Sequence, residues 1–207
     1  MNTQTTIEAE NIKTIKLRPF RDEIYYPESH DDDMGESALH HKLLAVFYFL
    51  LEAHFSASSD VAIAANMNLY YEKGNPYKYY TPDLMIAFGA KKYHRQVYKL
   101  WEEKIFPQVV FEIASERTWK NDIGEKSEFY AQFGTEEYYL FDPEREFLPL
   151  PLMAYRRQDD KLRYIQLENN RVLSPLLNLE IVDTGKSFRL FNPQTQEFLQ
   201  ALLTGEE

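Results

Sequence analysis

The chain has 207 residues, 44% of them hydrophobic, which predicts one domain with a complete core. It contains no cysteine, so disulfides, cysteine nucleophiles and zinc–thiolate sites are excluded, and a reducing cytoplasm is the expected location. The net charge of −10 argues against a protein that coats nucleic acid in general, although a local basic patch is still compatible with phosphate binding.

The first part of the chain is polar and then acidic. Residues 1–20 lack the apolar centre of a signal peptide and are expected to form a flexible arm, while residues 21–207 are expected to form a single domain. Residues 22–36 carry seven acids and no lysine or arginine, which is typical of a solvated loop. The longest apolar run, Leu43 to Leu51, is too short to span a membrane.

A long amphipathic helix is predicted from Ser37 to Phe55, because apolar residues recur there every three or four positions. Glu36 and His40 lie at the N-terminal end of its inner face. The apolar residues expected on this face are Leu39, Leu43, Val46, Phe47 and Leu50.

Two short apolar runs each contain one acidic residue. Asp83 follows Pro82 in the run from Tyr80 to Phe88, and Glu112 lies in the run from Phe106 to Ser115. Branched and aromatic residues bounded by Pro or Gly predict that both runs are buried strands. A buried carboxylate is costly unless it is paired or binds a metal. If the two strands are neighbours, Asp83 and Glu112 can converge on one side of the sheet.

A lysine follows on a predicted helix that begins near Asn121, a suitable N-cap, and ends at Gly134, a good C′ residue. Lys126 lies at the centre of the helix face that should pack on the sheet. Its ammonium therefore points inward, where it needs an anion, and the small Ala114 beside Glu112 leaves room for it. The other residues of that face are Ile123, Phe129, Tyr130 and Phe133.

The two acids and the lysine, Asp83, Glu112 and Lys126, together predict a divalent-metal site that cleaves phosphodiester bonds. Magnesium prefers oxygen ligands and binds few protein carboxylates together with substrate phosphate. A metal-bound water is a better nucleophile, and a lysine can position it or stabilise the charge of the transition state. Asp83, Glu112 and Lys126 are thus the predicted catalytic residues, with Mg²⁺ as cofactor and Mn²⁺ as substitute.

Four further residues have two open interpretations each. Asp122 is either an acid favoured by the helix dipole or a partner that orients Lys126. Tyr130 is either a core residue or a phosphate ligand. Glu36 and His40 either reach the edge of the metal site or are a helix-start acid and a buried neutral histidine.

Residues 91–99 are the most basic stretch of the chain. They lie between the two acid-bearing runs, so they are expected to lie near the predicted metal site and to bind DNA. The alternative is an exposed helix or hairpin that happens to be basic. The candidate DNA contacts are Lys91, Lys92, Arg95 and Lys99.

The remaining pattern predicts strands at residues 61–64, 68–71 and 137–141, a hairpin at 153–167, strands near 171–173 and 188–190, and a helix at 194–203. This order fits an α/β or α+β domain of three layers, with a central mixed sheet flanked by helices.

The motifs resemble the family named "putative restriction endonuclease", once catalogued only as a domain of unknown function, in the PD-(D/E)XK nuclease superfamily. The resemblance covers roughly residues 20–190, and Tyr139 stands where the family usually has Trp. It implies a restriction-endonuclease-like core, DNA as substrate and the backbone carbonyl of Ile113 as a further metal ligand. The matching segments are Pro82-Asp83, Glu112-Ile113-Ala114-Ser115, Asp122-x-x-x-Lys126-x-x-x-Tyr130 and Glu137-Tyr138-Tyr139-Leu140-Phe141-Asp142-Pro143.

Two other functions stay open at this point. One is a DNA-binding or regulatory protein without catalysis on the same scaffold, and the other is a two-carboxylate hydrolase of sugars. Trp101 and Trp119 are the only tryptophans, which is few for a sugar cleft. Because cutting both strands of a duplex commonly needs two active sites, a symmetric homodimer is predicted.

Overall fold

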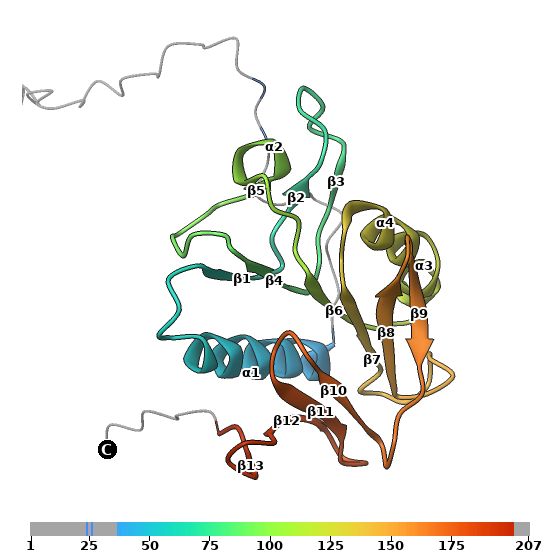
Figure 1. Cartoon of the computed structure of the whole chain (residues 1–207). Coiled ribbons are helices and arrows are strands. Elements are labelled where there is room, and N and C mark those ends of the chain that lie inside the picture. Colours follow the sequence, from blue (N-terminus) through green and yellow to red (C-terminus); the bar gives the residue numbers. More distant parts are fainter. Residues whose placement is uncertain (1–23, 25, 27–36, 201–207) are drawn as a thin grey trace, which may run out of the picture.

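The centre of the protein is a six-stranded mixed sheet with the strand order β1-β4-β6-β7-β8-β9 (Figure 1). The computed structural model describes residues 24, 26 and 37–200. Strands β6 and β7 pair in parallel, and the other neighbours pair antiparallel. The six strands are β1 (Val61–Ala65), β4 (Leu84–Phe88), β6 (Val109–Ile113), β7 (Glu137–Phe141), β8 (Leu152–Gln158) and β9 (Lys161–Ile165).

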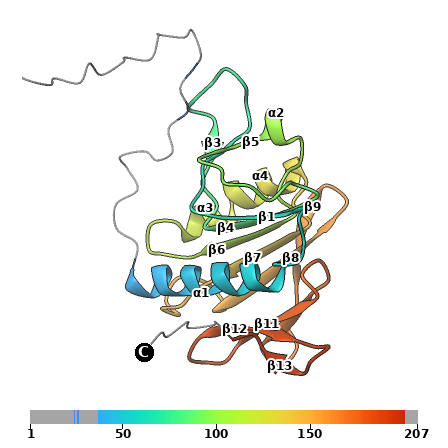
Figure 2. The same cartoon turned by 90° about the vertical axis from the view of Figure 1, so that its left-hand side faces the viewer.

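Helices cover both faces of this sheet, as the sequence predicted (Figure 2). Helix α1 (Ala38–His54) lies on one face, and α3 (Trp119–Ile123) and α4 (Glu125–Phe133) lie on the other. A second sheet packs beyond α1, and it consists of β10 (Arg171–Ser174), β11 (Leu179–Asp183), β12 (Phe188–Asn192) and β13 (Glu197–Phe198). A third sheet lies on the side of α4 and consists of β2 (Leu69–Tyr70), β3 (Tyr79–Tyr80) and β5 (Tyr98–Lys99), followed by α2 (Leu100–Glu103).

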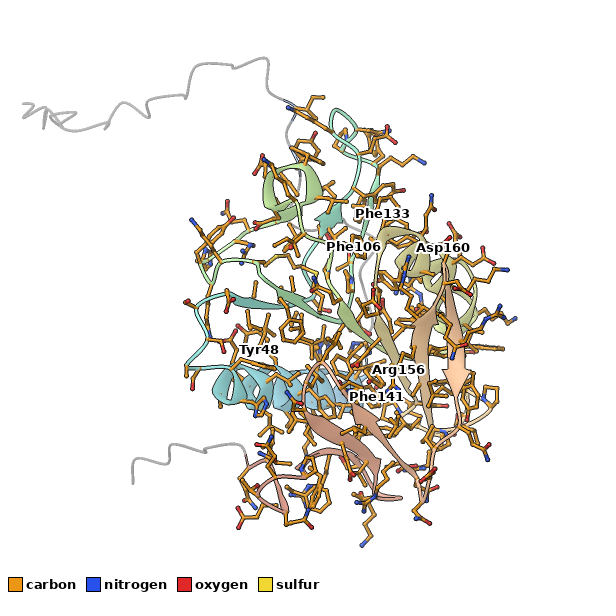
Figure 3. The ribbon with its side chains drawn as sticks, viewed as in Figure 1. Tyr48, Phe106, Phe133, Phe141, Arg156 and Asp160 are labelled. Atoms are coloured by element: carbon orange, nitrogen blue, oxygen red, sulfur yellow. The ribbon has the colours of Figure 1, made fainter. Side chains whose placement is uncertain are left out.

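The two faces of β6 enter two separate cores. Phe111 and its strand neighbours Val109 and Ile113 pack against α1, whereas Val110 packs toward α4. This follows from strand geometry, because successive side chains point to opposite faces. Figure 3 shows Phe141 near α1 and the ring pair Phe106 and Phe133 on the opposite side of the sheet.

Helix α1 begins where the sequence predicted, but its buried face differs slightly from the predicted one. The Ser37 hydroxyl accepts a hydrogen bond from the His40 amide at 3.2 Å, so Ser37 is the N-cap. Leu39 is 51% exposed, so its predicted place in the core is wrong. The buried face instead comprises His40, Leu43, Leu44, Phe47, Leu50 and Leu51.

Replacing Phe47 by alanine should lower the free energy of unfolding by about 3–5 kcal/mol, the usual cost of a buried Phe truncation. Phe47 is 2% exposed and packs edge to face on Phe111 and Phe141, with ring centroids 5.9 and 5.1 Å apart. Urea denaturation measures the change. Phe49→Ala is the matched control, since Phe49 lies in the same helix but is 63% exposed. Equal losses in both variants would contradict the packing described.

Two predicted elements differ from the observed ones, and one observed strand of the second sheet was not predicted. The helix expected from Asn121 to Gly134 is two helices, because Gly124 interrupts it and a Cβ there would lie 3.1 Å from the Lys120 carbonyl oxygen. Gly134 does end α4, with φ of 109°. The helix expected at 194–203 is wrong, since β13 occupies Glu197–Phe198 and residues 201–203 lie outside the described part. Strand β11 has no counterpart among the predictions.

The arm at residues 1–20 and almost all of the acidic run, including Glu36, lie outside the described residues. Tyr26 is described, and its hydroxyl accepts a hydrogen bond from the Gly74 amide at 2.9 Å. Among the helices of the described part, none is long and apolar enough to cross a membrane.

Candidate active site

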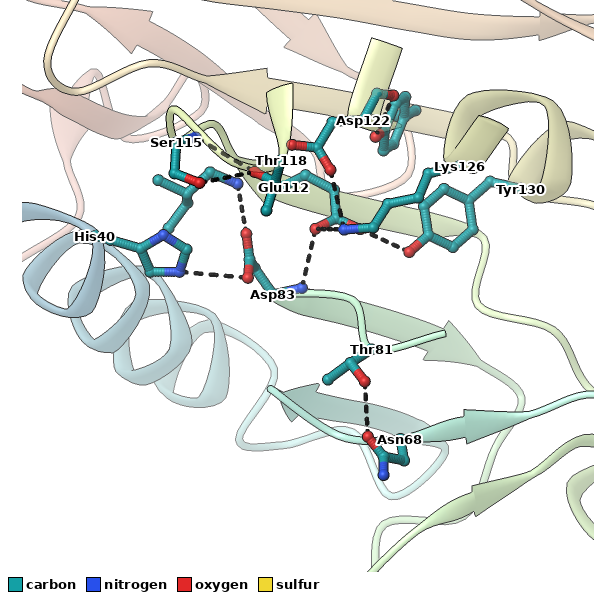
Figure 4. A network of polar contacts seen from close by, with 12 residues as sticks. His40, Asn68, Thr81, Asp83, Glu112, Ser115, Thr118, Asp122, Lys126 and Tyr130 are labelled. Atoms are coloured by element: carbon teal, nitrogen blue, oxygen red, sulfur yellow. Dashed lines mark hydrogen bonds and ion pairs between the residues drawn. The ribbon is translucent and has the colours of Figure 1, made fainter. Parts of the chain in front are cut away.

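Asp83 precedes β4 and joins this strand to β6 (Figure 4). The pairing of Leu84 with Phe111 places Asp83 opposite Glu112 one step further along. The Asp83 carboxylate accepts a hydrogen bond from the Ile113 amide at 2.6 Å, and the Asp83 amide lies 3.4 Å from Glu112 Oε2. The predicted convergence of the two acids is therefore present in the fold.

Glu112 is 1% exposed and is held from two sides. The Tyr130 hydroxyl donates to Oε1 at 2.6 Å, and Lys126 Nζ donates to Oε2 at 3.0 Å. Because Tyr130 occupies Oε1, the other oxygen is directed toward Lys126 and the Asp83 amide. Tyr130 is thus both a core residue, fully buried, and a fixed partner of Glu112.

Lys126 points inward, as the helix pattern indicated, and its side chain is 13% exposed. Nζ lies 3.0 Å from Asp122 Oδ1 as well as 3.0 Å from Glu112, so one ammonium joins two carboxylates. Asp122 is the last but one residue of α3 and Lys126 the second of α4, four positions apart on the two sides of Gly124, and the break between the helices leaves the two side chains in contact. Asp122 is therefore placed where it can orient Lys126, and it is also an acid of the first turn of α3, so both interpretations remain compatible with its position.

Burial and neighbouring charges shift the pKa of each of these groups. Burial raises the pKa of Glu112 to about 8, although Lys126 opposes the shift, and burial likewise raises the pKa of Asp122. Burial lowers the pKa of Lys126, but the carboxylates of Glu112, Asp122 and Asp83 outweigh it and raise this pKa above its ordinary value. Lys126 therefore stays charged, while three acids compete for its single positive charge.

His40 reaches the site from α1. Its Nε2 lies 3.3 Å from Asp83 Oδ1, and the side chain is 6% exposed. His40 and Asp83 are thus brought together as the sequence suggested. Glu36, the other residue expected from this end of the helix, lies outside the described residues.

Sequence reasoning did not find the pair that supports the segment before Asp83. The Thr81 hydroxyl donates to Asn68 Oδ1 at 2.7 Å, and Asn68 is 1% exposed (Figure 4). The Asn68 carbonyl also accepts a hydrogen bond from the Tyr98 amide at 2.9 Å. The sequence placed Asn68 at the start of a predicted strand, but strand alternation alone does not report that its side chain bonds to Thr81.

The basic segment 91–99 does not emerge near the acids, and that expectation is wrong. It leaves β4 at the end opposite Asp83, because β4 and β6 are antiparallel. Lys92 pairs with Glu52 at 2.7 Å, and Glu52 is separated from His40 by about 18 Å of helix at 1.5 Å per residue. Arg95 and Lys99 pair with Glu103 and Glu102, at 2.7 and 3.3 Å.

The residues present fit a hard divalent cation by donor type and by charge. Asp83, Glu112 and Asp122 offer carboxylate oxygens against one ammonium, and once Glu112 has lost its proton they carry an excess of negative charge that a cation would balance. Within the described residues, no group of three or more His, Cys, Asp or Glu side chains is arranged as a complete metal site. Magnesium needs only one or two carboxylates when waters and substrate phosphate supply the rest.

Comparisons with known proteins agree with this fold. A solved structure described as a putative nuclease belonging to DUF820, from Anabaena variabilis ATCC 29413, superposes with a TM-score of 0.51 and 12% sequence identity. The match covers 69% of this chain and 75% of that chain. No curated protein matches. The family model described as Uma2, "Putative restriction endonuclease", matches residues 33–184, which is more than half of the chain. The chain therefore belongs to this family, whose core is that of the restriction-endonuclease-like nucleases.

Proposed function

We propose that the protein is a divalent-metal-dependent nuclease that hydrolyses phosphodiester bonds in DNA. The observation that carries the proposal is the buried contact of Lys126 with Glu112, next to Asp83. A buried cluster of ionisable groups with shifted pKa values is a common property of catalytic sites. Family membership and the nuclease-like fold support the same reaction.

Each residue has a distinct role in this proposal. Asp83 and Glu112, with the Ile113 carbonyl, hold Mg²⁺ or Mn²⁺, which supplies Lewis-acid stabilisation and a more acidic water. Tyr130 fixes the Glu112 carboxylate through Oε1. Asp122 keeps the Lys126 ammonium at the site, where it can donate to a phosphate oxygen as negative charge develops.

A cleavage assay with purified protein tests the proposal. Supercoiled, linear and single-stranded DNA are incubated with magnesium, with manganese and with a chelator. Cleavage that needs the metal and is absent in Asp83→Asn supports the reaction. A chain that binds DNA but cleaves none of these forms under any metal would instead favour the non-catalytic DNA-binding function.

Metal affinity should rise with pH. Burial raises the pKa of Glu112 from 4.5 to about 8, so the metal must displace a proton at neutral pH. The apparent affinity for Mg²⁺ is therefore expected to increase as pH rises toward about 8 and to level off above it. Titration calorimetry between about pH 5.5 and 9 measures this slope. Glu112→Gln should bind weakly and without the slope, and a flat profile in the unaltered protein would refute the assignment.

A homodimer remains part of the proposal, because double-strand cleavage commonly uses two active sites. Light scattering should then give about twice the mass of one chain. A monomer at every working concentration would point instead to nicking or to cleavage of single strands.

DNA contact by residues 91–99 also remains a proposal. Lys91 is exposed, whereas Lys92, Arg95 and Lys99 each form an ion pair within the chain. Each of these three would have to leave a carboxylate before it could bind phosphate. The segment is therefore a weaker candidate than the sequence suggested, and the substrate strand needs another basic surface.

A further inference from the structure

A cavity of about 200 Å³ lies between α1 and the turn that joins β11 to β12. Three cationic side chains line it, Lys42 from α1, Arg145 from the loop after β7 and Lys186 from the turn. Among the described residues, no acidic side chain lines it. Its remaining wall is mainly apolar and includes Leu39, Val46 and Phe188.

The three cationic side chains of the cavity differ in whether a carboxylate neutralises them. Arg145 forms a two-pronged contact with Asp183, at 3.0 and 2.5 Å, which fixes its position and balances its charge. Lys42 and Lys186 are exposed, and within the described residues no ion pair is found for either. In a chain of net charge −10, these two lysines form a local positive site suited to an anion.

Hydrogen bonds make the walls of the cavity rigid. Asp142 is fully buried and accepts hydrogen bonds from the amides of Arg145, Phe147 and Leu148, at 2.8, 2.7 and 2.9 Å. On the other side, Asp183 accepts from the Gly185 amide at 2.8 Å, and Thr184 and Ser187 close the turn. The cations from these two segments are therefore carried on fixed backbone.

The cavity lies at the same end of the central strands as the acidic cluster of Asp83, Glu112 and Asp122, but on the α1 side of the sheet. Lys126, by contrast, lies on the α4 side (Figure 2). Leu43 lines this cavity and also a small void against Asp83, and His40, which contacts Asp83, is one turn earlier in α1. The strands agree with this placement. The Ala114 amide donates to the Phe141 carbonyl at 2.6 Å, and Pro143 of the cavity wall follows Phe141 by two residues.

We propose that this cavity binds a backbone phosphate of the nucleic-acid substrate, on the α1 side of the sheet and outside the cluster around Lys126. Lys42 and Lys186 bind the phosphate oxygens, and the apolar wall with Leu39 and Phe188 packs on the adjoining sugar or base. Phosphates of one strand repeat about every 3.4 Å of helix axis, so a strand that passes around this end of the sheet presents a phosphate to the cavity as well as one to the cluster around Lys126. Leu39, which is 51% exposed, then has a reason to be apolar. This inference rests on the proposed function, because it makes the cavity a subsite of that reaction.

DNA binding at increasing salt tests the cavity, with chelator present so that no cleavage occurs. In fluorescence anisotropy, Lys42→Ala/Lys186→Ala should bind a labelled duplex at least tenfold more weakly. Its plot of log affinity against log salt should be shallower by about 1, because one neutralised phosphate is lost. Lys73→Ala/Lys78→Ala removes two exposed lysines of the β2–β3 loop and should match the unaltered protein. Lys42→Arg/Lys186→Arg should restore the slope.

The outcomes separate this inference from the proposed function. If the unaltered protein cleaves DNA and the Lys42/Lys186 variant binds with the same slope, the cavity assignment is overturned while the nuclease stands. If the protein cleaves nothing but its DNA binding depends on both lysines, the cavity stands and the nuclease fails. Equal losses of affinity in the Lys73/Lys78 control would overturn the assignment, because the effect would then not be specific to the cavity. Displacement of the labelled duplex by inorganic phosphate at the same concentration as the duplex would overturn it too, because the site would then prefer the free ion to a strand. Failure to bind any DNA overturns both.

Discussion

Lys126→Ala should reduce DNA cleavage at least a hundredfold, the scale seen when one donor to a transition state is removed. The reason is positional, since its ammonium lies 3.0 Å from both Glu112 and Asp122 at the place where substrate phosphate would carry charge. Metal affinity should not fall, because removing the lysine frees a Glu112 oxygen. Rates with manganese on several DNA forms measure the effect, and full activity would refute the assignment.

Two controls separate this effect from misfolding. Lys126 pairs with two buried acids, Glu112 and Asp122. Its removal should therefore lower the free energy of unfolding, although protonation of Glu112 limits the loss. Lys126→Met keeps the length of the side chain and should be equally inactive. Lys161→Ala, at an exposed position of β9, should be fully active.

Asp83→Asn should weaken magnesium binding by about a hundredfold or more, since loss of even an outer-shell partner typically costs 10–100-fold. An asparagine can still accept the hydrogen bond of the Ile113 amide, so the junction of β4 and β6 should remain intact. Titration calorimetry measures the affinity, and circular dichroism checks the fold.

Asp60→Asn provides the matched comparison, because Asp60 is exposed just before β1 and far along the sheet from Glu112. Its affinity should equal that of the unaltered protein. Unchanged affinity in Asp83→Asn would move the metal site elsewhere, whereas equal losses in both variants would indicate only diffuse electrostatic attraction.

The acidic cluster was predictable because its signals are local. Strand alternation placed Glu112 with Val110 and apart from Phe111, and the helix repeat placed Lys126 on the buried face. Local patterns also gave β7 and the β8–β9 hairpin, whose turn contains Asp159 with φ of 55°.

The placement of the basic segment depended on strand direction, which no local pattern reports. Asp83 lies at the start of its strand and Glu112 near the end of its own, so the two acids meet only if the strands are antiparallel. In that case the connection between the two strands leaves from their other ends, away from Asp83 and Glu112. The cavity with Lys42 and Lys186 could not be predicted from the sequence for a related reason, because its walls come from three segments that are distant in the chain.

Helix α1 packs between the central sheet and the second sheet, β10 to β13, whose residues come much later in the chain. This order has a consequence for folding during synthesis on the ribosome. The buried residues of α1 pack on Leu179, Ile181 and Leu190, and His54 contacts the Leu177 carbonyl across 123 positions of sequence. At typical translation rates the helix waits on the order of ten seconds for these partners. Until they emerge, the outer face of α1 is uncovered and the contact of His40 with Asp83 lacks its support. The nascent chain is therefore expected to complete the contact between His40 and Asp83 only after β11 and β12 have been made.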